Sequence, residues 1–451
     1  MEYSHDTISA ISTPLGIGGI SVLRVSGDES INIVSNIFKS KTSLKDQQSH
    51  TAIFGRILDA GKLVDEVIVT IFKSPHSYTS EDVVEISCHG STFITNQILS
   101  ILLRNSRLAE PGEFTQRAFL NDKIGLTQAE AVGDLLTAKT KIFHLAALEQ
   151  YEGSLRNRIE KLLSQLTKFR TEIELEIDFL ENDLDELDNE KLIKGLTKLQ
   201  KELIQLAKTG EEGLIIKDGL KVSLVGAPNV GKSSIFNSFL ETERAIVTPI
   251  PGTTRDYLEE VISLNGYLVR VFDTAGLRET TDQIEKIGIK RSYEIIEDSH
   301  KVLFVVDGDE NKKEYDILTK LVDADKIIKI LNKSDKFDES ELSKFAKKGY
   351  IICSTIENSG LSELKNSLLH NIEISEEELH SGILTNTRQI AAVTKAAQSV
   401  SKALESIEND MGYEFTAFDL KEASTALEEI IGKVTSDEIL NNIFTNFCIG
   451  K

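Results

Sequence analysis

Residues 226–233 read GAPNVGKS and carry the sharpest chemical signal in the chain. An apolar stretch precedes them and a helical pattern follows, and this order of strand, glycine-rich loop and helix is typical of a phosphate-binding loop. Glycines allow the loop to turn tightly, so that successive backbone amides face an anion at the helix N-terminus. The sequence therefore predicts a nucleotide site in which Lys232 contacts the β- and γ-phosphates and the Ser233 hydroxyl binds Mg²⁺.

The base of the nucleotide is indicated by the sequence NKSD, which begins at Asn332 and follows another apolar strand pattern. In such a loop the carboxylate of Asp335 accepts the N1 and N2 hydrogens of guanine, whereas adenine offers neither donor and leaves a buried carboxylate unpaired. Taken alone, these four residues are typical of a polar turn. Their position after the phosphate loop, with Ser354 and Thr355 beyond a further strand, predicts that the base is guanine.

Two segments between these motifs are expected to surround the γ-phosphate. Asp273 begins the sequence DTAG, in which its carboxylate holds Mg²⁺ through water and the amide of Gly276 senses the γ-phosphate. Residues 252–256 read GTTRD and form the candidate switch loop, with Thr254 as a second Mg²⁺ ligand. Each motif alone is as typical of a solvated turn, but their order in one α/β segment predicts a GTPase. The expected nucleotide-binding residues are Asn229, Val230, Gly231, Lys232, Ser233, Ser234, Thr248, Pro249, Ile250, Pro251, Gly252, Thr253, Asp273, Thr274, Ala275, Gly276, Asn332, Lys333, Asp335, Ser354 and Thr355.

The residue after Gly276 is Leu277, where Ras-like enzymes place a glutamine that orients the attacking water. An apolar side chain cannot position water, so this role must fall to another group. Glu285 is one candidate, although its charge pattern alone favours a solvated glutamate on a helix. The residues expected to act in catalysis are Glu285, Lys232, Thr254 and Gly276.

Composition restricts the class of protein. A chain of 451 residues with 40% hydrophobic and 27% charged residues is typical of a soluble protein of two or three domains. No signal peptide or long apolar stretch is evident, so we expect a cytoplasmic protein without membrane association. Cys88, Cys353 and Cys448 match no zinc or C-x-x-C spacing, which fits a reducing compartment. The net charge of −21 excludes broad non-specific nucleic-acid binding, so any RNA contact must be local or delegated to a basic partner.

Helical patterns flank the nucleotide motifs on both sides. Apolar residues recur with helical period over residues 155–177, and a second helix is expected to about residue 208. Two further stripes follow the nucleotide motifs, at residues 390–407 and 420–431. The sequence TQAE at residues 127–130 predicts a capping box at the start of the first bundle helix. We therefore expect an α/β unit inserted into a helical bundle.

The region up to about residue 120 has a different pattern. Strand patterns at residues 20–25, 64–72 and 82–88 alternate with helical patterns at 29–38 and 92–103, which predicts an independent α+β domain. The expected fold class is thus multidomain, α+β and α/β, and the P-loop GTPase domain should contain a mixed sheet with helices on both faces. The expected domain ranges are 1–120 for the α+β domain, 121–217 and 381–451 for the helical domain, and 218–380 for the GTPase domain.

A resemblance to a known family covers essentially the whole chain. It is carried by DTISA at 6–10, GGISVLRVSG at 18–27, YTSEDVVE at 78–85, PGEF at 111–114, RAFLNDK at 117–123, PGTTRD at 251–256, DTAGLR at 273–278 and FCIGK at 447–451. On these segments the sequence closely resembles the MnmE (TrmE) family of bacterial and organellar tRNA modification GTPases. The nucleotide motifs occur in many GTPases, whereas the N-terminal and C-terminal segments are far more specific.

The resemblance implies a function and partners. Members form a homodimer through the N-terminal domain, which is similar to folate-binding domains and holds 5-formyl-tetrahydrofolate or a related folate. With the flavoprotein MnmG (GidA), in a heterotetramer, they add an aminomethyl or carboxymethylaminomethyl group to the 5-position of the wobble uridine of certain tRNAs. A tetrahydrofolate one-carbon unit is used, and GTP hydrolysis, which depends on K⁺ and on dimerisation of the nucleotide domains, drives a conformational change.

The resemblance also assigns roles in hydrolysis. By the family pattern, K⁺ would be bound by the Asn229 side chain, the Thr248 and Ile250 carbonyls and Thr253, and hard oxygen ligands suit such a cation. The cation would supply positive charge in a site that has Leu277 in place of glutamine. Glu285 occupies the position of the family's water-organising glutamate.

Four further residues match folate-contacting positions of the family, namely Arg24, Glu85, Lys123 and Lys451. Glu85 suits the amide and amino edge of a pterin, and cations suit the glutamate tail. Without the family, Arg24 and Glu85 would be interpreted as ordinary surface charges. For Cys448, a thiol role in the modification chemistry and a packed structural role are both open.

Two rival functions belong to other classes. A ribosome-assembly or translation GTPase would share every nucleotide motif but would have no reason for the N-terminal signatures or Cys448. A folate-dependent one-carbon transferase with a regulatory nucleotide domain is the other rival. Folate binding measured with and without the flavoprotein partner would separate the alternatives.

Overall fold

The computed structural model describes residues 6–178, 188–242, 259–273, 283–308, 310–370, 372, 374–434 and 436–451. The chain divides into two compact units. One unit comprises residues 1–136, 150–200 and 395–451, and the other comprises residues 137–149 and 201–394. The four domain ranges expected from the sequence remain predictions. Within the described ranges, no helix has the length and apolarity needed to cross a bilayer.

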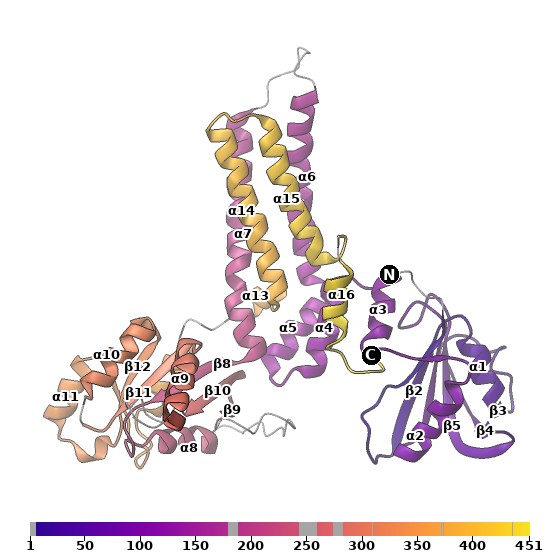
Figure 1. Ribbon diagram of the computed structural model, residues 1–451, viewed down its shortest axis with the longest axis horizontal. Helices are drawn as coiled ribbons and strands as arrows, with labels where there is room; N and C mark the ends of the chain where they lie inside the picture. Colours follow the sequence, from indigo (N-terminus) through magenta and orange to yellow (C-terminus); the bar gives the residue numbers. More distant parts are fainter. Residues whose placement is uncertain are drawn as a thin grey trace. The chain divides into compact units, whose positions relative to one another are not determined.

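The N-terminal part of the first unit is built on a sheet of seven strands in the order β3-β4-β5-β6-β2-β1-β7 (Figure 1). Its strands are β1 (Ile8–Ile11), β2 (Ile20–Ser26), β3 (Phe38–Ser40), β4 (Thr51–Asp59), β5 (Lys62–Phe72), β6 (Val83–His89) and β7 (Arg107–Leu108). Neighbouring strands are antiparallel except β1 and β7, which are parallel. The α+β character expected for this region is confirmed.

Two helices, α1 (Ser30–Ile37) and α2 (Thr92–Leu102), cover one face of this sheet. Side-chain burial alternates along β6, because successive side chains of a strand point to opposite faces and the helices cover only one of them. Val84 and Ile86 are fully buried in the core that contains Ile98 and Leu102 of α2, whereas Glu85 is only half-buried. Arg24 of β2 is the cross-strand partner of Glu85, so both side chains lie on the face that these helices leave open.

The helical part of the chain contains the helices expected at residues 155–177, up to about residue 208, at 390–407 and at 420–431, together with others that were not predicted. They are α3 (Glu113–Leu120), α4 (Leu126–Thr137), α5 (Lys141–Glu152), α6 (Ser154–Asp178), α7 (Asn189–Asp218), α13 (Glu376–His380), α14 (Thr387–Glu408), α15 (Tyr413–Ile431) and α16 (Asp437–Phe444). In the first unit α15 packs along α6 (Figure 1). The apolar stripe of α6 is buried as its period requires, with Leu155, Ile159 and Leu166 fully enclosed.

The capping box expected at residues 127–130 is wrong. Helix α4 begins at Leu126, so Thr127 lies inside the helix and cannot be its N-cap residue. Its hydroxyl is buried and has no hydrogen-bond partner in the part of the chain that the structure describes. The helix is capped instead from the next residue, because Gln128 Oε1 accepts a hydrogen bond from the Gly125 amide at 2.9 Å.

The second unit contains a sheet of six strands in the order β13-β12-β11-β8-β10-β9. Its strands are β8 (Leu220–Val225), β9 (Glu259–Leu264), β10 (Tyr267–Asp273), β11 (Lys301–Val306), β12 (Ile327–Leu331) and β13 (Tyr350–Ile352). The edge strand β9 runs antiparallel to β10 and the other pairs are parallel, so the expected mixed sheet is confirmed.

Helices lie on both faces of this sheet, as expected. They are α8 (Lys232–Thr242), α9 (Gln283–Glu297), α10 (Lys312–Leu321), α11 (Glu339–Lys347) and α12 (Leu361–Leu369). Adjacent residues of β11 illustrate the two-sided burial: Phe304 packs into a core with Ile296 of α9, whereas Val305 packs into a separate core with Leu364 of α12. Strands that are buried on both faces need continuous apolar runs, which explains the composition of β8, β11 and β12.

Candidate functional site

The phosphate loop connects β8 to α8 and has two positions that only glycine fits. Gly226 has a φ of +150°, and a Cβ there would lie 2.2 Å from the Val305 carbonyl oxygen. Gly231 has a φ of +95°, and its Cβ would lie 2.1 Å from Asn332 Nδ2. Both approaches are far shorter than a van der Waals contact, and both φ values disfavour side chains. The glycines of the motif therefore permit the loop to pass close to two neighbouring segments.

Lys232 begins helix α8 and folds back over the loop. Its Nζ donates hydrogen bonds to the Gly226 carbonyl at 2.7 Å and to the Ala227 carbonyl at 3.2 Å. Ser233 and Ser234 follow in the first turn and are exposed. The first amides of a helix have no partner within the helix and carry partial positive charge. The ammonium group, the exposed hydroxyls and the helix N-terminus thus converge on one loop, which is the arrangement a phosphate chain requires.

Asn332 joins the guanine loop to the phosphate loop. Its backbone amide donates to the Val306 carbonyl at 2.9 Å, and its side-chain Nδ2 donates to the Val230 carbonyl at 2.9 Å. Asn332 is 1% exposed, and its Oδ1 is buried without a hydrogen-bond partner among the described residues. A buried acceptor of this kind is costly unless a donor reaches it, so the site suits a ligand that offers an N–H or O–H group.

Lys333 makes a second link between the same loops. Its φ is +60°, and its Nζ donates to the Asn229 carbonyl at 2.6 Å and to Asp307 Oδ2 at 2.7 Å. Asn229 also has a positive φ, of +65°. Asp307 is a site residue that the sequence reasoning missed. The available signal was its position directly after the apolar strand β11, whose carboxyl end lies at the same sheet edge as the phosphate loop.

The carboxylate of Asp335 is oriented by the loop that follows β13. Ser354 Oγ donates to Asp335 Oδ1 at 2.7 Å, and the Ser334 amide donates to the Cys353 carbonyl at 3.0 Å. Ser354 is fully buried, and Thr355 beside it is half-buried. Burial raises the pKa of the Cys353 thiol to about 12, so this cysteine stays protonated and packs as a small apolar residue.

Asp273 lies at the end of β10, in register with Leu224 of β8. Because the two strands are parallel, its carboxylate and the phosphate loop lie at the same edge of the sheet. Asp273 Oδ1 is buried and accepts no hydrogen bond within the described ranges. A buried carboxylate oxygen without a donor fits a hydrated divalent cation.

Several predicted residues lie outside the part of the chain that the structure describes. These are Thr248, Pro249, Ile250, Pro251, Gly252, Thr253, Thr254, Thr274, Ala275 and Gly276, together with Leu277. Glu285 lies in the first turn of α9, but its side chain is outside the description. Among the described residues, the structure brings Asn229, Val230, Gly231 and Lys232 together with Asn332 and Lys333.

A second polar site occurs on the open face of the N-terminal sheet. Arg24 of β2 and Glu85 of β6 are direct cross-strand partners, and Arg24 Nε and Nη2 donate to Glu85 Oε1 at 3.0 and 2.8 Å. The guanidinium carbon lies 4.9 Å from the centre of the Tyr78 ring and 5.5 Å from that of Phe114. Arg24 is thus held between two aromatic rings and a carboxylate. The two rings are further site residues that the sequence reasoning did not single out.

The other two predicted cations, Lys451 and Lys123, contact the main chain at or next to the residues that carry these rings. The Phe114 amide donates to the Lys451 carbonyl at 3.2 Å, which places the C-terminal residue next to α3. Lys123 Nζ donates to the Ser77 carbonyl, directly before Tyr78. Burial lowers the pKa of Lys123. Arg24 and Glu85 thus share one face with the Tyr78 and Phe114 rings, and the contacts of Lys123 and Lys451 bring their segments to the same region.

Cys448 lies in the same C-terminal segment. Its carbonyl accepts a hydrogen bond from the Gly112 amide at 3.4 Å, and Ile449 forms a bridge with Pro111. The cysteine itself is exposed. The alternative of a packed structural cysteine is therefore not what the structure has.

A buried ion network supports the aromatic rings of this site. Arg117 is 3% exposed and pairs with Asp6, Glu81 and Glu113 at 2.7, 3.2 and 3.0 Å. Burial alone would raise the pKa of Glu113, but hydrogen bonds from Arg107, the Glu110 amide and Arg117 outweigh it and lower the pKa. The network joins the segment that carries Tyr78 to the helix that carries Phe114.

Comparisons with known proteins cover the whole chain. The family model for the MnmE helical domain matches residues 126–448, and the model for the GTP-binding protein TrmE N-terminus matches residues 7–123. A tRNA modification GTPase MnmE from Flavobacterium johnsoniae is 40% identical and covers 99% of this chain and 100% of the relative. The MnmE proteins of Clostridioides difficile and Acetivibrio thermocellus are 41% and 40% identical, and in both comparisons all of each chain is covered.

Among solved structures, the G domain of the T. maritima FeoB iron transporter is 30% identical and covers 34% of this chain and 99% of that chain. The TM-score is 0.27, so the assignment depends on the family models and the full-length relatives instead. The relatives are about 40% identical over complete chains, and the two family models together match residues 7–123 and 126–448. The chain belongs to the MnmE (TrmE) family of tRNA modification GTPases.

Proposed function

We propose that the protein is a K⁺-dependent GTP hydrolase that acts in the cytoplasm with the flavoprotein MnmG (GidA) on certain tRNAs. The complex adds an aminomethyl or carboxymethylaminomethyl group to the 5-position of the wobble uridine and takes a one-carbon unit from tetrahydrofolate. The observation that carries the nucleotide part is the Asn332–Val230 hydrogen bond of 2.9 Å, which joins the guanine loop to the phosphate loop. Family membership carries the tRNA part.

The nucleotide residues have separate tasks. Lys232 and the first amides of α8 hold the β- and γ-phosphates, and Asp335, oriented by Ser354, reads the guanine edge. Water then forms a bond to the γ-phosphorus as the bond to the bridging β–γ oxygen breaks, giving GDP and phosphate. Lys232 offsets the negative charge that develops on the leaving oxygen.

The Mg²⁺ ion of the nucleotide would be held by Ser233 and Thr254, with Asp273 acting through water. The buried Asp273 Oδ1, which accepts no hydrogen bond from described residues, supports this role. Mg²⁺ would supply positive charge to the β- and γ-phosphate oxygens.

The potassium site would be formed by the Asn229 side chain, the Thr248 and Ile250 carbonyls and Thr253. The Asn229 carbonyl already accepts a hydrogen bond from Lys333 Nζ at 2.6 Å. The side chain of Asn229 would therefore be the group that binds K⁺. K⁺ would supply positive charge in addition to that of Lys232, and Glu285 would organise the attacking water that Leu277 cannot position.

The folate site would use Arg24, Glu85, Lys123 and Lys451. Both hydrogen bonds from Arg24 go to Glu85 Oε1, and Glu85 Oε2 accepts none from the described residues, so one oxygen is free for an amide or amino donor. The Glu85 side chain is 27% exposed, which allows a ligand to reach it. The folate would supply the one-carbon unit, and Cys448 is exposed and near enough in the chain to Lys451 to act in the same chemistry.

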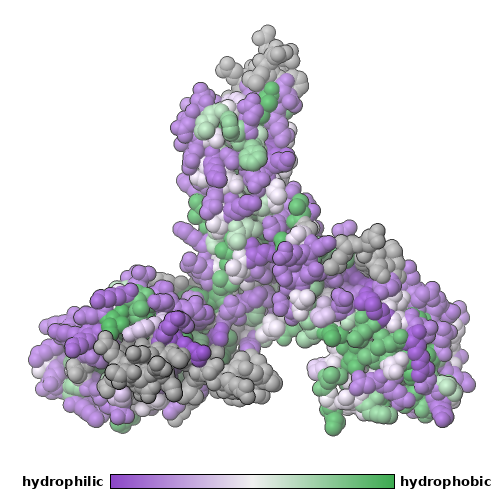
Figure 2. Space-filling view, in the orientation of Figure 1, coloured by the Kyte–Doolittle hydropathy of each residue, from purple (hydrophilic) through white to green (hydrophobic). Residues whose placement is uncertain are grey.

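Dimerisation through the N-terminal domain is supported by its apolar surface. Large hydrophobic side chains are exposed there at Leu15, Ile17, Ile20, Phe54, Ile68 and Phe93. Figure 2 shows apolar surface over this domain. Exposed apolar patches of this kind mark contact surfaces, and we propose that a second copy covers this one within the heterotetramer formed with MnmG.

GTP turnover in KCl and in NaCl of equal ionic strength tests the proposal. We expect hydrolysis in K⁺ and little in Na⁺, and equal turnover in the two salts would contradict the potassium site. Folate titration with and without the flavoprotein separates the proposal from a one-carbon transferase that works alone. A ribosome-assembly GTPase would hydrolyse GTP but would not bind folate at Arg24 and Glu85.

A further inference from the structure

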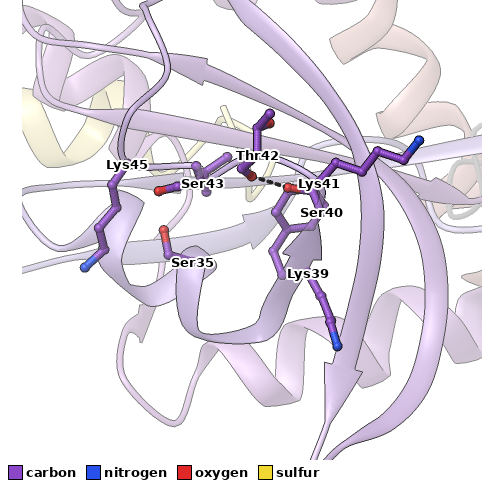
Figure 3. A pocket seen from close by; sticks show the side chains of 9 residues that line it. Ser35, Lys39, Ser40, Lys41, Thr42, Ser43 and Lys45 are labelled. Atoms are coloured by element: carbon purple, nitrogen blue, oxygen red, sulfur yellow. Dashed lines mark hydrogen bonds between the residues drawn. The ribbon is translucent and has the colours of Figure 1, made fainter.

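The N-terminal domain contains a basic pocket that the proposed function leaves unused. It has a volume of about 260 Å³ and lies between the end of α1 and the turn after β3, where it is lined by Ser35 and residues 38–45 (Figure 3). Three lysines line it, Lys39, Lys41 and Lys45, and no carboxylate does. Three lysines on one short turn are unexpected in a chain with a net charge of −21. Neighbouring like charges also repel one another unless an anion binds between them.

The backbone of this turn presents hydrogen-bond donors. The carbonyl of Thr42 accepts from Ser40 Oγ, that of Ser43 accepts from Gln47 Nε2 at 2.9 Å, and that of Leu44 accepts from the Gln47 amide at 3.3 Å. In contrast, the amides of residues 41–45 donate to no acceptor within the described ranges. Satisfied carbonyls beside free amides give the turn a positive electrostatic character, as in other loops that bind anions.

The lysines extend from the rim of the pocket in different directions, as Figure 3 shows. All three are exposed, so their ammonium groups keep their hydration and can contact ligands without a large desolvation cost. Diverging cations match the successive phosphates of a chain better than a single enclosed anion. The nearest carboxylate in the sequence is Asp46, which is exposed and does not line the pocket.

We propose that this turn, residues 39–45, binds the phosphate backbone of the substrate tRNA. The inference rests on the proposed function, which makes tRNA the substrate of the complex that this acidic protein forms. Salt limits the range of charge interactions to about 8 Å at physiological ionic strength. The turn therefore attracts RNA through its local charge, and the distant carboxylates that make the chain acidic do not cancel it.

The test compares two charge-matched triple variants of the full chain. One is Lys39→Gln/Lys41→Gln/Lys45→Gln, and the control is Lys312→Gln/Lys313→Gln/Lys320→Gln, in which three exposed lysines of α10 are changed. The probe is an unmodified tRNA with uridine at the wobble position, titrated at several KCl concentrations. Each phosphate contact contributes about 0.7–0.9 to the slope of log K against log salt. We expect the turn variant to lose about 2–3 from that slope and about tenfold or more in tRNA affinity.

GTP hydrolysis without tRNA should be the same in the wild type and in both variants, since none of the six lysines belongs to the nucleotide site. Equal tRNA affinity in the wild type and the turn variant would overturn the inference alone, and so would an equal loss in both triple variants. A wild type that binds no tRNA would also overturn the inference and would assign the RNA contact to the flavoprotein, whereas the proposed function fails only if wobble uridines stay fully modified in a strain that lacks the gene. Inorganic phosphate is the second probe, and tight phosphate binding that the turn variant loses without any change in tRNA affinity would contradict the assignment to RNA.

Discussion

Asn332 Nδ2 donates a hydrogen bond to the Val230 carbonyl at 2.9 Å and lies where a Cβ on Gly231 would come within 2.1 Å. This one amide therefore fixes the distance between the guanine loop and the phosphate loop. The two loops follow β12 and β8, which are separated in the sheet by β11. The contact spans that intervening strand and holds the base site and the phosphate site in one arrangement.

Gly231→Ala should weaken GTP binding by about tenfold or more. Strain at a positive φ costs about 1–3 kcal/mol, and the methyl group also displaces Asn332. Isothermal titration with GTP measures the effect. Gly61→Ala is the matched control, because Gly61 also has a positive φ, of +81°, but its Cβ would meet nothing within 4 Å. Unchanged GTP affinity in Gly231→Ala would contradict the close approach of the two loops.

The nucleotide site was largely predictable because its chemistry is contained in short contiguous motifs. The glycines, Lys232, Asn332 and Asp335 all lie in loops whose flanking strands have continuous apolar runs. Such runs are a strong signal for a parallel sheet, and the carboxyl ends of parallel strands bring their loops to one edge. The Lys333–Asp307 pair was missed, since an acidic residue after a strand is a weak signal and its partner depends on the backbone conformation of Lys333.

The N-terminal site shows the limit of sequence reasoning. Arg24 and Glu85 have the pattern of surface charges, and only the packing of distant segments places Tyr78 and Phe114 against the guanidinium group. The capping box at Thr127 was wrong because the T-x-x-E pattern also occurs inside helices. The backbone conformation of the preceding residue, Leu126, determines whether the helix has already begun. The basic turn could not be identified from the sequence, because only the structure shows that its backbone amides donate no hydrogen bond among the described residues.

Asp335→Asn should weaken GTP binding and admit xanthosine triphosphate. The new amide leaves the N2 donors of guanine unmatched, whereas the O2 of xanthine can accept from it. Competition binding with GTP and XTP measures the change in preference. Ser354→Ala is the control: it removes the hydrogen bond of 2.7 Å to Asp335 Oδ1 but keeps the carboxylate, so GTP should remain preferred. An unchanged preference in Asp335→Asn would show that Asp335 does not read the base.

Glu285→Ala should leave GTP affinity within a few-fold but slow hydrolysis by roughly 10–10³-fold, the range for loss of a water-positioning group. Single-turnover hydrolysis in K⁺, together with a nucleotide titration, separates the two effects. Glu297→Ala changes an exposed glutamate at the other end of α9 and should hydrolyse GTP like the wild type. Hydrolysis at the wild-type rate in Glu285→Ala would mean that Glu285 is a solvated residue of the helix without a role in hydrolysis.

Acid should destabilise the sheet of the second unit through His300. Its Nδ1 accepts a hydrogen bond from the Lys221 amide at 2.9 Å. Burial, together with the charge of Lys221, lowers the pKa of His300. The unfolded chain therefore binds a proton that the folded chain does not, in the window below the ordinary histidine pKa of about 6.5. The contribution is fully present above that pKa and is lost as the pH falls through the window.

The variant His300→Asn keeps an acceptor near the Nδ1 position but cannot titrate. Urea unfolding of the full chain at about pH 7.5 and about pH 5.5, on either side of the ordinary histidine pKa, measures the difference. The wild type should lose more stability than the variant between the two pH values. An identical loss in the two proteins would mean that His300 does not couple folding to pH.

Nucleoside mass spectrometry of tRNA detects the proposed modification of the wobble uridine itself. The tRNA is isolated from a strain that lacks this gene and from the same strain carrying the wild type or Lys232→Ala. We expect wobble uridines to lose their aminomethyl-type group at the 5-position in the deletion strain, to regain it with the wild type, and not to regain it with Lys232→Ala. Fully modified wobble uridines in the deletion strain would contradict the proposed function.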